Sequence, residues 1–134
     1  MSDAVNHPSY YADGKYEVID FIENYEMGFH IGNAVKYISR AGKKDFSKRI
    51  QDLEKAIWYL NRALDKNVYE VPGGKKVHTI SIVKYCSEKK ISNLLESALI
   101  HIVFGQIVSA IDLINMQINN WKDAEPLPSA SAAQ

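Results

Sequence analysis

Apolar side chains recur between residues 50 and 64 at alternating steps of three and four: Ile50, Leu53, Ile57, Leu60 and Leu64. This spacing places them on one stripe of a helix, and such a stripe is stabilised mainly by packing against other helices. Asp45 or Ser47 precedes the run and can cap its first turn. The pattern therefore predicts a long helix inside a mainly α-helical domain.

Four further segments carry apolar residues at helical spacing, and glycines follow three of them where helices commonly end: Gly28, Gly42 and Gly105. The last two segments are separated by Gly105, so we expect them to form an antiparallel pair. The four expected helices span residues 16–27, 30–41, 92–104 and 106–121. Together with the helix at residues 50–64, they predict a compact domain of about five helices.

Residues 67–82 have a different composition, with β-branched side chains on both sides of Pro72-Gly73-Gly74. This pattern predicts a small β-hairpin near residues 68–82. We therefore expect a helical module over residues 1–66, a hairpin with a C-terminal helix pair over 67–122, and a flexible tail over 123–134. The helix pair packs in the same unit or assembles copies of the chain, and its large apolar faces predict a homo-oligomer.

Charge and cysteine content limit the class of protein. Sixteen basic residues balance sixteen acidic ones, so we expect no bulk binding to nucleic acid. The single cysteine, Cys86, cannot form an internal disulfide, which fits a reducing compartment. Polar residues interrupt the apolar C-terminal stretches, and the first residues lack the pattern of a secretory signal. We expect a soluble cytoplasmic protein with no membrane span.

The expected helix at residues 30–41 carries one polar face, formed by His30, Asn33, Lys36, Tyr37 and Arg40. Their spacing of three and four residues puts these side chains on one side of the helix, away from its apolar stripe. A carboxamide, an imidazole, a phenol and a guanidinium offer directional contacts to bases, sugars and phosphates. The alternative is an ordinary solvated helix face, and spacing alone does not separate the two.

A cationic loop follows this face, and a second polar stripe follows the loop. Gly42, Lys43 and Lys44 lead into the start of the next helix, where backbone N–H groups and the helix dipole favour an anion. The alternative is a helix end with solvated lysines. The second stripe repeats the three-four-three spacing on the helix at residues 50–64, so the two stripes can face one groove. It consists of Asp52, Lys55, Tyr59 and Arg62.

Candidate metal ligands are few. Asp20 and Glu23 lie three residues apart on the first expected helix and could hold Mg²⁺ with water completing its coordination. The alternative is an acidic face turned to solvent. His7, His78 and His101 lack metal-ligand spacing, and the GGKKVHT segment after Pro72 lacks the pattern of a phosphate-binding P-loop.

Several short motifs follow one another in the first half of the chain. They are Asn6-His7-Pro8-Ser9, Ile19-Asp20-Phe21-Ile22-Glu23, Gly32-Asn33-Ala34-Val35-Lys36-Tyr37, Arg40-Ala41-Gly42-Lys43-Lys44 and Asp52-Leu53 with Lys55-Ala56-Ile57-Trp58-Tyr59-Leu60. In this order they resemble a phage family catalogued as a domain of unknown function, number 3310, over about residues 5–65. One departure is Tyr10, where the family usually has a second histidine. The family resembles the module found in a phage deoxynucleoside monophosphate kinase that has no P-loop, and a phage-encoded chain would be located in the host cytoplasm.

This resemblance implies a nucleotide ligand and a set of site residues. Lys36, Arg40 and Lys43 would bind phosphates, because phosphoryl transfer depends on positioning and charge neutralisation. Asp20 or Asp52 would hold Mg²⁺, while Asn33 and Tyr37 would contact base or sugar. We assign Lys36, Arg40 and Asp52 as catalytic residues. The assigned nucleotide-binding residues are Asn6, His7, Asn33, Tyr37, Lys43, Lys44, Lys55 and Tyr59, and the metal ligands are Asp20 and Glu23.

The leading functional hypothesis is phosphoryl transfer to deoxynucleoside monophosphates. A first alternative is a non-catalytic protein that sequesters a nucleotide or nucleotide signal and so counters a host response. A second is an all-α nucleoside triphosphate pyrophosphohydrolase, since acidic pairs on helices can hold the metal ions this chemistry needs. A third is a scaffold that assembles through its C-terminal helices.

Overall fold

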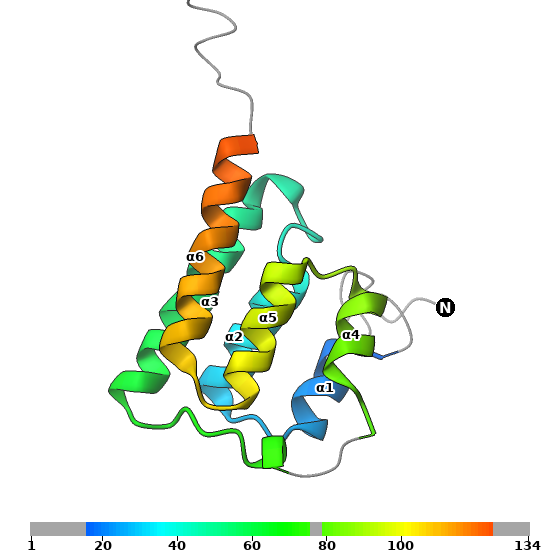
Figure 1. Cartoon of the computed structure of the whole chain (residues 1–134), viewed down its shortest axis with the longest axis vertical. Helices are drawn as coiled ribbons and strands as arrows, with labels where there is room; N and C mark the ends of the chain where they lie inside the picture. Colours follow the sequence, from blue (N-terminus) through cyan, green and yellow to red (C-terminus); the bar gives the residue numbers. More distant parts are fainter. Residues whose placement is uncertain (1–15, 76–78, 125–134) are drawn as a thin grey trace, which may run out of the picture.

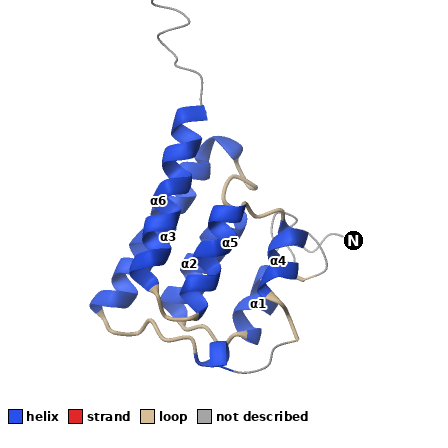
Figure 2. Ribbon diagram, viewed as in Figure 1, coloured by secondary structure: helices blue, strands red, loops and turns tan. Residues whose placement is uncertain are grey.

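Six α-helices in the described part of the chain form two layers of three (Figures 1 and 2). The computed structural model describes residues 16–75 and 79–124. In Figure 1, α6 lies in front of α3 and α5 in front of α2, and each of these pairs is in contact. The first layer contains α1 (Val18–Asn24), α2 (Phe29–Arg40) and α3 (Arg49–Asp65), and the second contains α4 (Ile82–Lys89), α5 (Asn93–Val103) and α6 (Ile107–Ala124).

Local signals explain most of the helix ends. The hydroxyls of Ser81 and Ser92 accept hydrogen bonds from backbone N–H groups in the first turns of α4 and α5. Gly105 has a φ of +78°, which lets the chain turn sharply between α5 and α6. Asp45 caps a short 3-10 helix, η1 (Phe46–Lys48), which runs directly into α3. The predicted cap therefore acts one element earlier than expected.

The apolar stripe of α3 lies at the centre of the molecule, as its spacing predicts. Leu53 and Leu60 are fully buried, and Ile50, Ile57 and Leu64 pack against the core from its edge. This core is one continuous cluster that takes side chains from both layers. The predicted module at residues 1–66 and the helix pair that follows it therefore share their hydrophobic core.

The predicted β-hairpin near residues 68–82 is wrong for the residues that can be described there. Residues 68–75 and 79–82 contain no strand, and Pro72–Lys75 forms a second 3-10 helix, η2. The N–H of Gly73 donates a hydrogen bond to the carbonyl of Tyr25, 3.2 Å away, at the end of α1. The Pro-Gly-Gly segment thus provides a close backbone approach between two elements rather than a turn between two strands.

Helix α4 is the element that the sequence reasoning missed. Tyr85 in this helix is fully buried, and its ring stacks on Phe21 of α1 with centroids 4.1 Å apart and an interplanar angle of 7°. Its hydroxyl lies 2.8 Å from that of Ser39 in α2 and donates a hydrogen bond to it. Through these contacts, α4 joins the two layers at the end of the molecule opposite α3.

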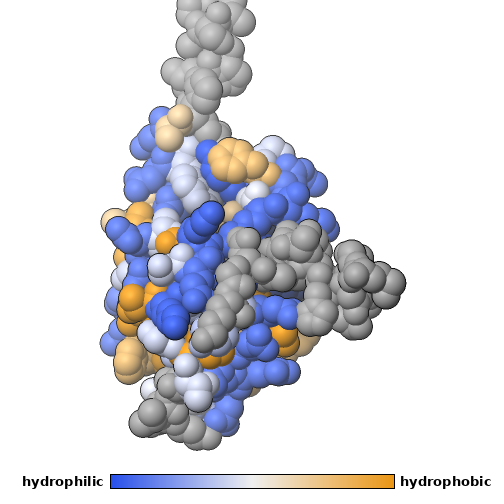
Figure 3. Space-filling view, turned by 90° about the vertical axis from the view of Figure 1, so that its right-hand side faces the viewer, coloured by the Kyte–Doolittle hydropathy of each residue, from blue (hydrophilic) through white to orange (hydrophobic). Residues whose placement is uncertain are grey.

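The surface of the described residues carries both hydrophilic and apolar side chains. The face shown in Figure 3 is mainly hydrophilic with separate small apolar patches. Across residues 16–75 and 79–124, no helix combines the length and apolar character needed to cross a membrane. The predicted tail over 123–134 is wrong for its first two residues, because α6 continues to Ala124. Residues 125–134 lie outside the described part of the chain.

Candidate functional site

Helices α2 and α3 run antiparallel and bring their two predicted polar stripes together. The ring of Phe29, at the start of α2, lies 6.2 Å from that of Tyr59 near the end of α3. At the opposite ends of the two helices, Arg40 forms an ion pair with Asp52. Residues at the start of one helix therefore meet residues at the end of the other, and both stripes border one surface.

Tyr37 is the centre of this surface. Its ring stacks on that of Tyr59 with centroids 6.0 Å apart and an interplanar angle of 15°. Three cationic groups lie over the same ring, with Lys36 Nζ at 4.7 Å, Arg40 Cζ at 4.6 Å and Lys55 Nζ at 5.4 Å from its centroid. Cation–π attraction helps to hold three positive charges close together. We call these five residues the Tyr37 cluster.

Asp52 is buried beside the cluster and fixes its geometry. Its Oδ1 lies 3.7 Å from Arg40 Nη2, and its Oδ2 accepts a hydrogen bond of 3.1 Å from the N–H of Gly42. Gly42 has a φ of +80°, and a Cβ at this position would lie 2.9 Å from Cβ of Arg49. The carboxylate therefore ties the loop after α2 to the first turn of α3.

A cationic pocket of about 310 Å³ opens next to this ion pair. Four basic side chains outnumber two carboxylates around it, so a phosphate there would meet a net positive charge. Lys48 and Gln51 are additions that the sequence reasoning missed, although Lys48 precedes Asp52 by one helical turn. The lining residues are Arg40, Lys44, Asp45, Lys48, Gln51, Asp52 and Lys55.

Lys43 does not line this pocket. Its Nζ donates a hydrogen bond to the carbonyl of Lys89 in the last turn of α4. A cation at the end of a helix is favourable because the carbonyl groups there carry partial negative charge. Of the two lysines in the predicted phosphate loop, Lys44 lines the cationic pocket and Lys43 links the loop to the second layer.

Asn33 lies on the other side of the Tyr37 cluster, in a shallow apolar pocket of about 280 Å³. Its side-chain amide donates a hydrogen bond of 2.8 Å to the carbonyl of Phe29 in the same helix. Lys36 lines this pocket too and so lies between it and the rest of the cluster. The complete lining is Ile19, Ile22, Met27, Gly28, Phe29, Gly32, Asn33 and Lys36.

The predicted metal ligands lie elsewhere on the first layer. Asp20 accepts a hydrogen bond of 3.0 Å from the N–H of Glu17 at the start of α1. Asp20 and Glu23 border a third pocket, and neither lines the cationic pocket. Within the described ranges, no three side chains of His, Cys, Asp or Glu converge as metal ligands. Magnesium at Asp20 and Glu23 stays a prediction, and Asn6 and His7 lie outside the described residues.

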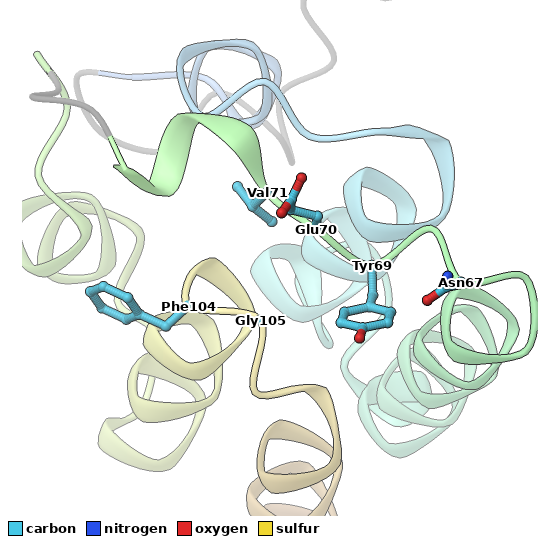
Figure 4. Close-up of a pocket in the computed structure, with 6 residues that line it drawn as sticks. All are labelled: Asn67, Tyr69, Glu70, Val71, Phe104 and Gly105. Atoms are coloured by element: carbon cyan, nitrogen blue, oxygen red, sulfur yellow. The ribbon is translucent and has the colours of Figure 1, made fainter.

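A further pocket, of about 450 Å³, lies between the segment that follows α3 and the turn between α5 and α6, and is drawn in Figure 4. Tyr69 and Phe104 point in different directions there, and Glu70 is its charged side chain. A pocket that contains a carboxylate and no cation is unsuited to phosphate. The cationic pocket beside the Tyr37 cluster is therefore the better candidate for an anionic ligand.

Residues 5–61 match the model of a family described as protein of unknown function (DUF3310), which confirms the resemblance to that family for this segment. The likeness to a kinase module stays a prediction. The matched segment includes α1, α2, η1 and most of α3, so it contains the whole Tyr37 cluster. No curated protein and no solved structure matches the chain significantly.

Proposed function

We propose that this chain is a phage-type nucleotide-binding protein and that the cationic pocket between α2 and α3 holds the phosphates of its ligand. The observation that carries the proposal is the grouping of Lys36, Arg40 and Lys55 around one tyrosine ring, next to a pocket with two further lysines. Clustered cations repel one another unless an anion or a π-face compensates them. A bound phosphate adds that compensation.

The two pockets beside the cluster suggest how a nucleotide lies. Its phosphates contact Arg40, Lys44 and Lys55 in the cationic pocket. Its base or sugar contacts Tyr37 and reaches toward Asn33, whose carboxamide lines the apolar pocket. This division is the usual one for such ligands, because phosphates select charged donors and bases select flat apolar surfaces with a few polar groups.

For the reaction, we propose phosphoryl transfer from a nucleoside triphosphate to a deoxynucleoside monophosphate, which the family resemblance suggests. In this reaction Lys36, Arg40 and Lys55 neutralise charge on the phosphoryl group as it moves between two phosphate oxygens. Asp52 is a positioning residue in this proposal, because both of its oxygens already have partners that fix Arg40 and Gly42. We place the protein in the host cytoplasm.

A second candidate is nucleotide binding without turnover, by which a phage could sequester a nucleotide signal. It is favoured by the two carboxylates of the cationic pocket, which both make structural contacts. Asp52 pairs with Arg40 and Gly42, while Asp45 accepts hydrogen bonds from the N–H and hydroxyl of Ser47. The pyrophosphohydrolase stays a prediction from the sequence, because no observation on the described residues favours its metal chemistry.

Thermal shifts with a panel of nucleoside mono-, di- and triphosphates test the binding proposal, since a ligand of the folded state raises its stability. We expect Lys55→Gln to weaken binding about tenfold, the usual effect of losing one charged hydrogen bond. Lys66→Gln is the matched control. Lys66 is exposed and directly follows α3, the helix that carries Lys55, but it lines neither of the two pockets at the site. A chain that no nucleotide stabilises would disprove the proposal.

Turnover separates the two candidates. The protein is incubated with a deoxynucleoside monophosphate, ATP and Mg²⁺, and the nucleotides are then separated by chromatography. Formation of the deoxynucleoside diphosphate at a rate that Lys55→Gln lowers, and Lys66→Gln does not, supports transfer. Recovery of both bound nucleotides unchanged after long incubation favours binding without turnover.

A further inference from the structure

Two large aromatic side chains next to the Tyr37 cluster are exposed to solvent and have no role in the function proposed above. Phe29 on α2 is 71% exposed and Trp58 on α3 is 59% exposed. Both rings meet Tyr59 edge to face, with centroid distances of 6.2 Å for Phe29 and 5.1 Å for Trp58. We call Phe29, Trp58 and Tyr59 the aromatic end of the surface.

The aromatic end and the cationic pocket lie at opposite ends of the α2–α3 pair. Phe29 is the first residue of α2 and Arg40 the last, so the surface between them is about 16 Å long at about 1.5 Å per residue. Tyr37 and Lys36 fill the middle. Stacked nucleotides advance by about 3.4 Å each, so this length exceeds one nucleotide and suits about four to five.

We propose that the surface binds a short single-stranded oligonucleotide of about four nucleotides. Bases at one end stack on Trp58 and Phe29, and phosphates at the other end contact Arg40 and Lys55. Flat side chains beside a row of cations are the usual means of holding unpaired strands without reading their sequence. The inference rests on the proposed function in its use of the Tyr37 cluster, and it names a longer ligand for the same site.

The net charge of the chain is compatible with a short single-stranded oligonucleotide as the ligand. Its net charge of zero gives no long-range attraction to duplex DNA, so binding must come from this local surface. A second copy of the chain is a less suitable occupant. Centres of protein interfaces are depleted in lysine, whereas Lys36 and Lys55 lie over the Tyr37 ring, which itself stacks on Tyr59 of the aromatic end.

The test measures affinity for thymidine monophosphate and for oligothymidylates of increasing length, by calorimetry at low salt. We expect the dissociation constant to fall at least tenfold between one and about four nucleotides and then to level off, because added bases reach beyond the aromatic end. For the tetranucleotide, we expect the logarithm of the affinity to fall with the logarithm of salt concentration with a slope near −2, as about three neutralised phosphates predict.

Variants of the exposed aromatic residues locate the strand. We expect Trp58→Ala to weaken tetranucleotide binding about tenfold and to leave the affinity for thymidine monophosphate unchanged. Phe104→Ala is the matched control, because Phe104 is similarly exposed, at 66%, but lies at the turn after α5. The chain has two tryptophans, so fluorescence quenching by the tetranucleotide that is lost in Trp58→Phe assigns the stacking to this ring.

Three results would overturn the inference. The first is equal affinity for the mono- and tetranucleotide. The second is a tetranucleotide affinity that Trp58→Ala leaves unchanged, and the third is light scattering showing that Trp58→Ala instead dissociates a dimer. Mononucleotide binding is measured separately, so each of these results can be distinguished from a failure of the proposed function. Conversely, strong tetranucleotide binding without mononucleotide binding would support the inference and contradict the proposed nucleotide ligand.

Discussion

Arg40 and Asp52 form an ion pair across the α2–α3 surface, and both side chains are nearly buried, at 12% and 8% exposure. The same carboxylate accepts the N–H of Gly42, so one side chain holds a cation of the candidate site and the loop that follows it. A buried charge that loses its partner is costly. Removal of the Asp52 carboxylate should therefore destabilise the fold.

We expect Asp52→Ala to lower the free energy of unfolding by about 2 to 3 kcal/mol, because Arg40 and the N–H of Gly42 both lose their acceptor. Asp52→Asn should cost less, since its amide oxygen can still accept from Gly42. Urea denaturation measures both. Asp65→Ala, an exposed position at the end of the same helix, should change stability by less than about 0.5 kcal/mol. Equal losses in all three variants would contradict the role of Asp52.

Gly73 is the point where the η2 segment touches the end of α1. An added Cβ would lie 2.4 Å from the carbonyl oxygen of Tyr25, so Gly73→Ala must push the two backbones apart. We expect a loss of about 2 kcal/mol or more, as for other overpacked sites. Gly28→Ala is the control, because no atom lies within 4 Å of its added Cβ. Thermal unfolding of the two variants compares them, and an unchanged midpoint in Gly73→Ala would disprove this contact.

Cys86 makes the stability depend on pH in the alkaline range. Burial raises the pKa of its thiol from an ordinary value near 9 to about 12, and Glu96 adds to this effect. Between these values the unfolded chain loses the thiol proton while the folded chain keeps it. The contribution of Cys86 to the free energy of unfolding should therefore be constant below pH 9 and be lost as the pH rises toward 12.

Urea denaturation at several pH values tests this dependence. We expect a shallower fall for Cys86→Ala than for the unchanged chain between pH 9 and 10, where tyrosine ionisation contributes less. Burial raises the pKa of Tyr25 and of Tyr85 as well, so both variants lose stability at higher pH. Identical slopes in the two chains between pH 9 and 10 would show that the thiol has no part in it.

The predicted homo-oligomer depends on what the C-terminal helices leave exposed. Most of their apolar residues are buried in the shared core, and Val108 and Met116 on α6 are the large exposed ones, at 63% and 51%. If these helices assemble copies of the chain, Val108→Glu with Met116→Glu should leave a particle of 15.2 kDa in light scattering. A larger particle that survives both substitutions would place the interface elsewhere.

Sequence periodicity predicted the helices in which the spacing of apolar residues repeats over several turns. The stripe from Ile50 to Leu64 marked α3 because five aliphatic residues keep the same spacing. Helix α4 has eight residues, and its buried positions are Tyr85, Cys86 and Lys89 rather than aliphatic residues. The predicted hairpin near residues 68–82 ends where this helix begins, and eight residues with few aliphatic side chains give too little periodicity to predict a helix.

In the candidate site, the positions that share one helix could also be predicted, whereas the contacts between helices could not. Lys36, Tyr37 and Arg40 lie on one helix, so their shared face followed from spacing alone. Their contacts with Lys55 and Tyr59 depend on the register between α2 and α3, which spacing leaves open. The position of Lys43 depends on α4, an element that was not predicted, and so its hydrogen bond to Lys89 could not be anticipated.

The family match ends at residue 61, whereas α3 packs against α6 and α2 against α5 from beyond that point. The boundary of sequence similarity is therefore not a boundary of cooperative folding. If the chain were cut after α3, the buried side chains of Leu53 and Leu60 would lose part of their cover. Any chain that shares the matched segment and its packing must supply an equivalent second layer, from its own later residues or from another molecule.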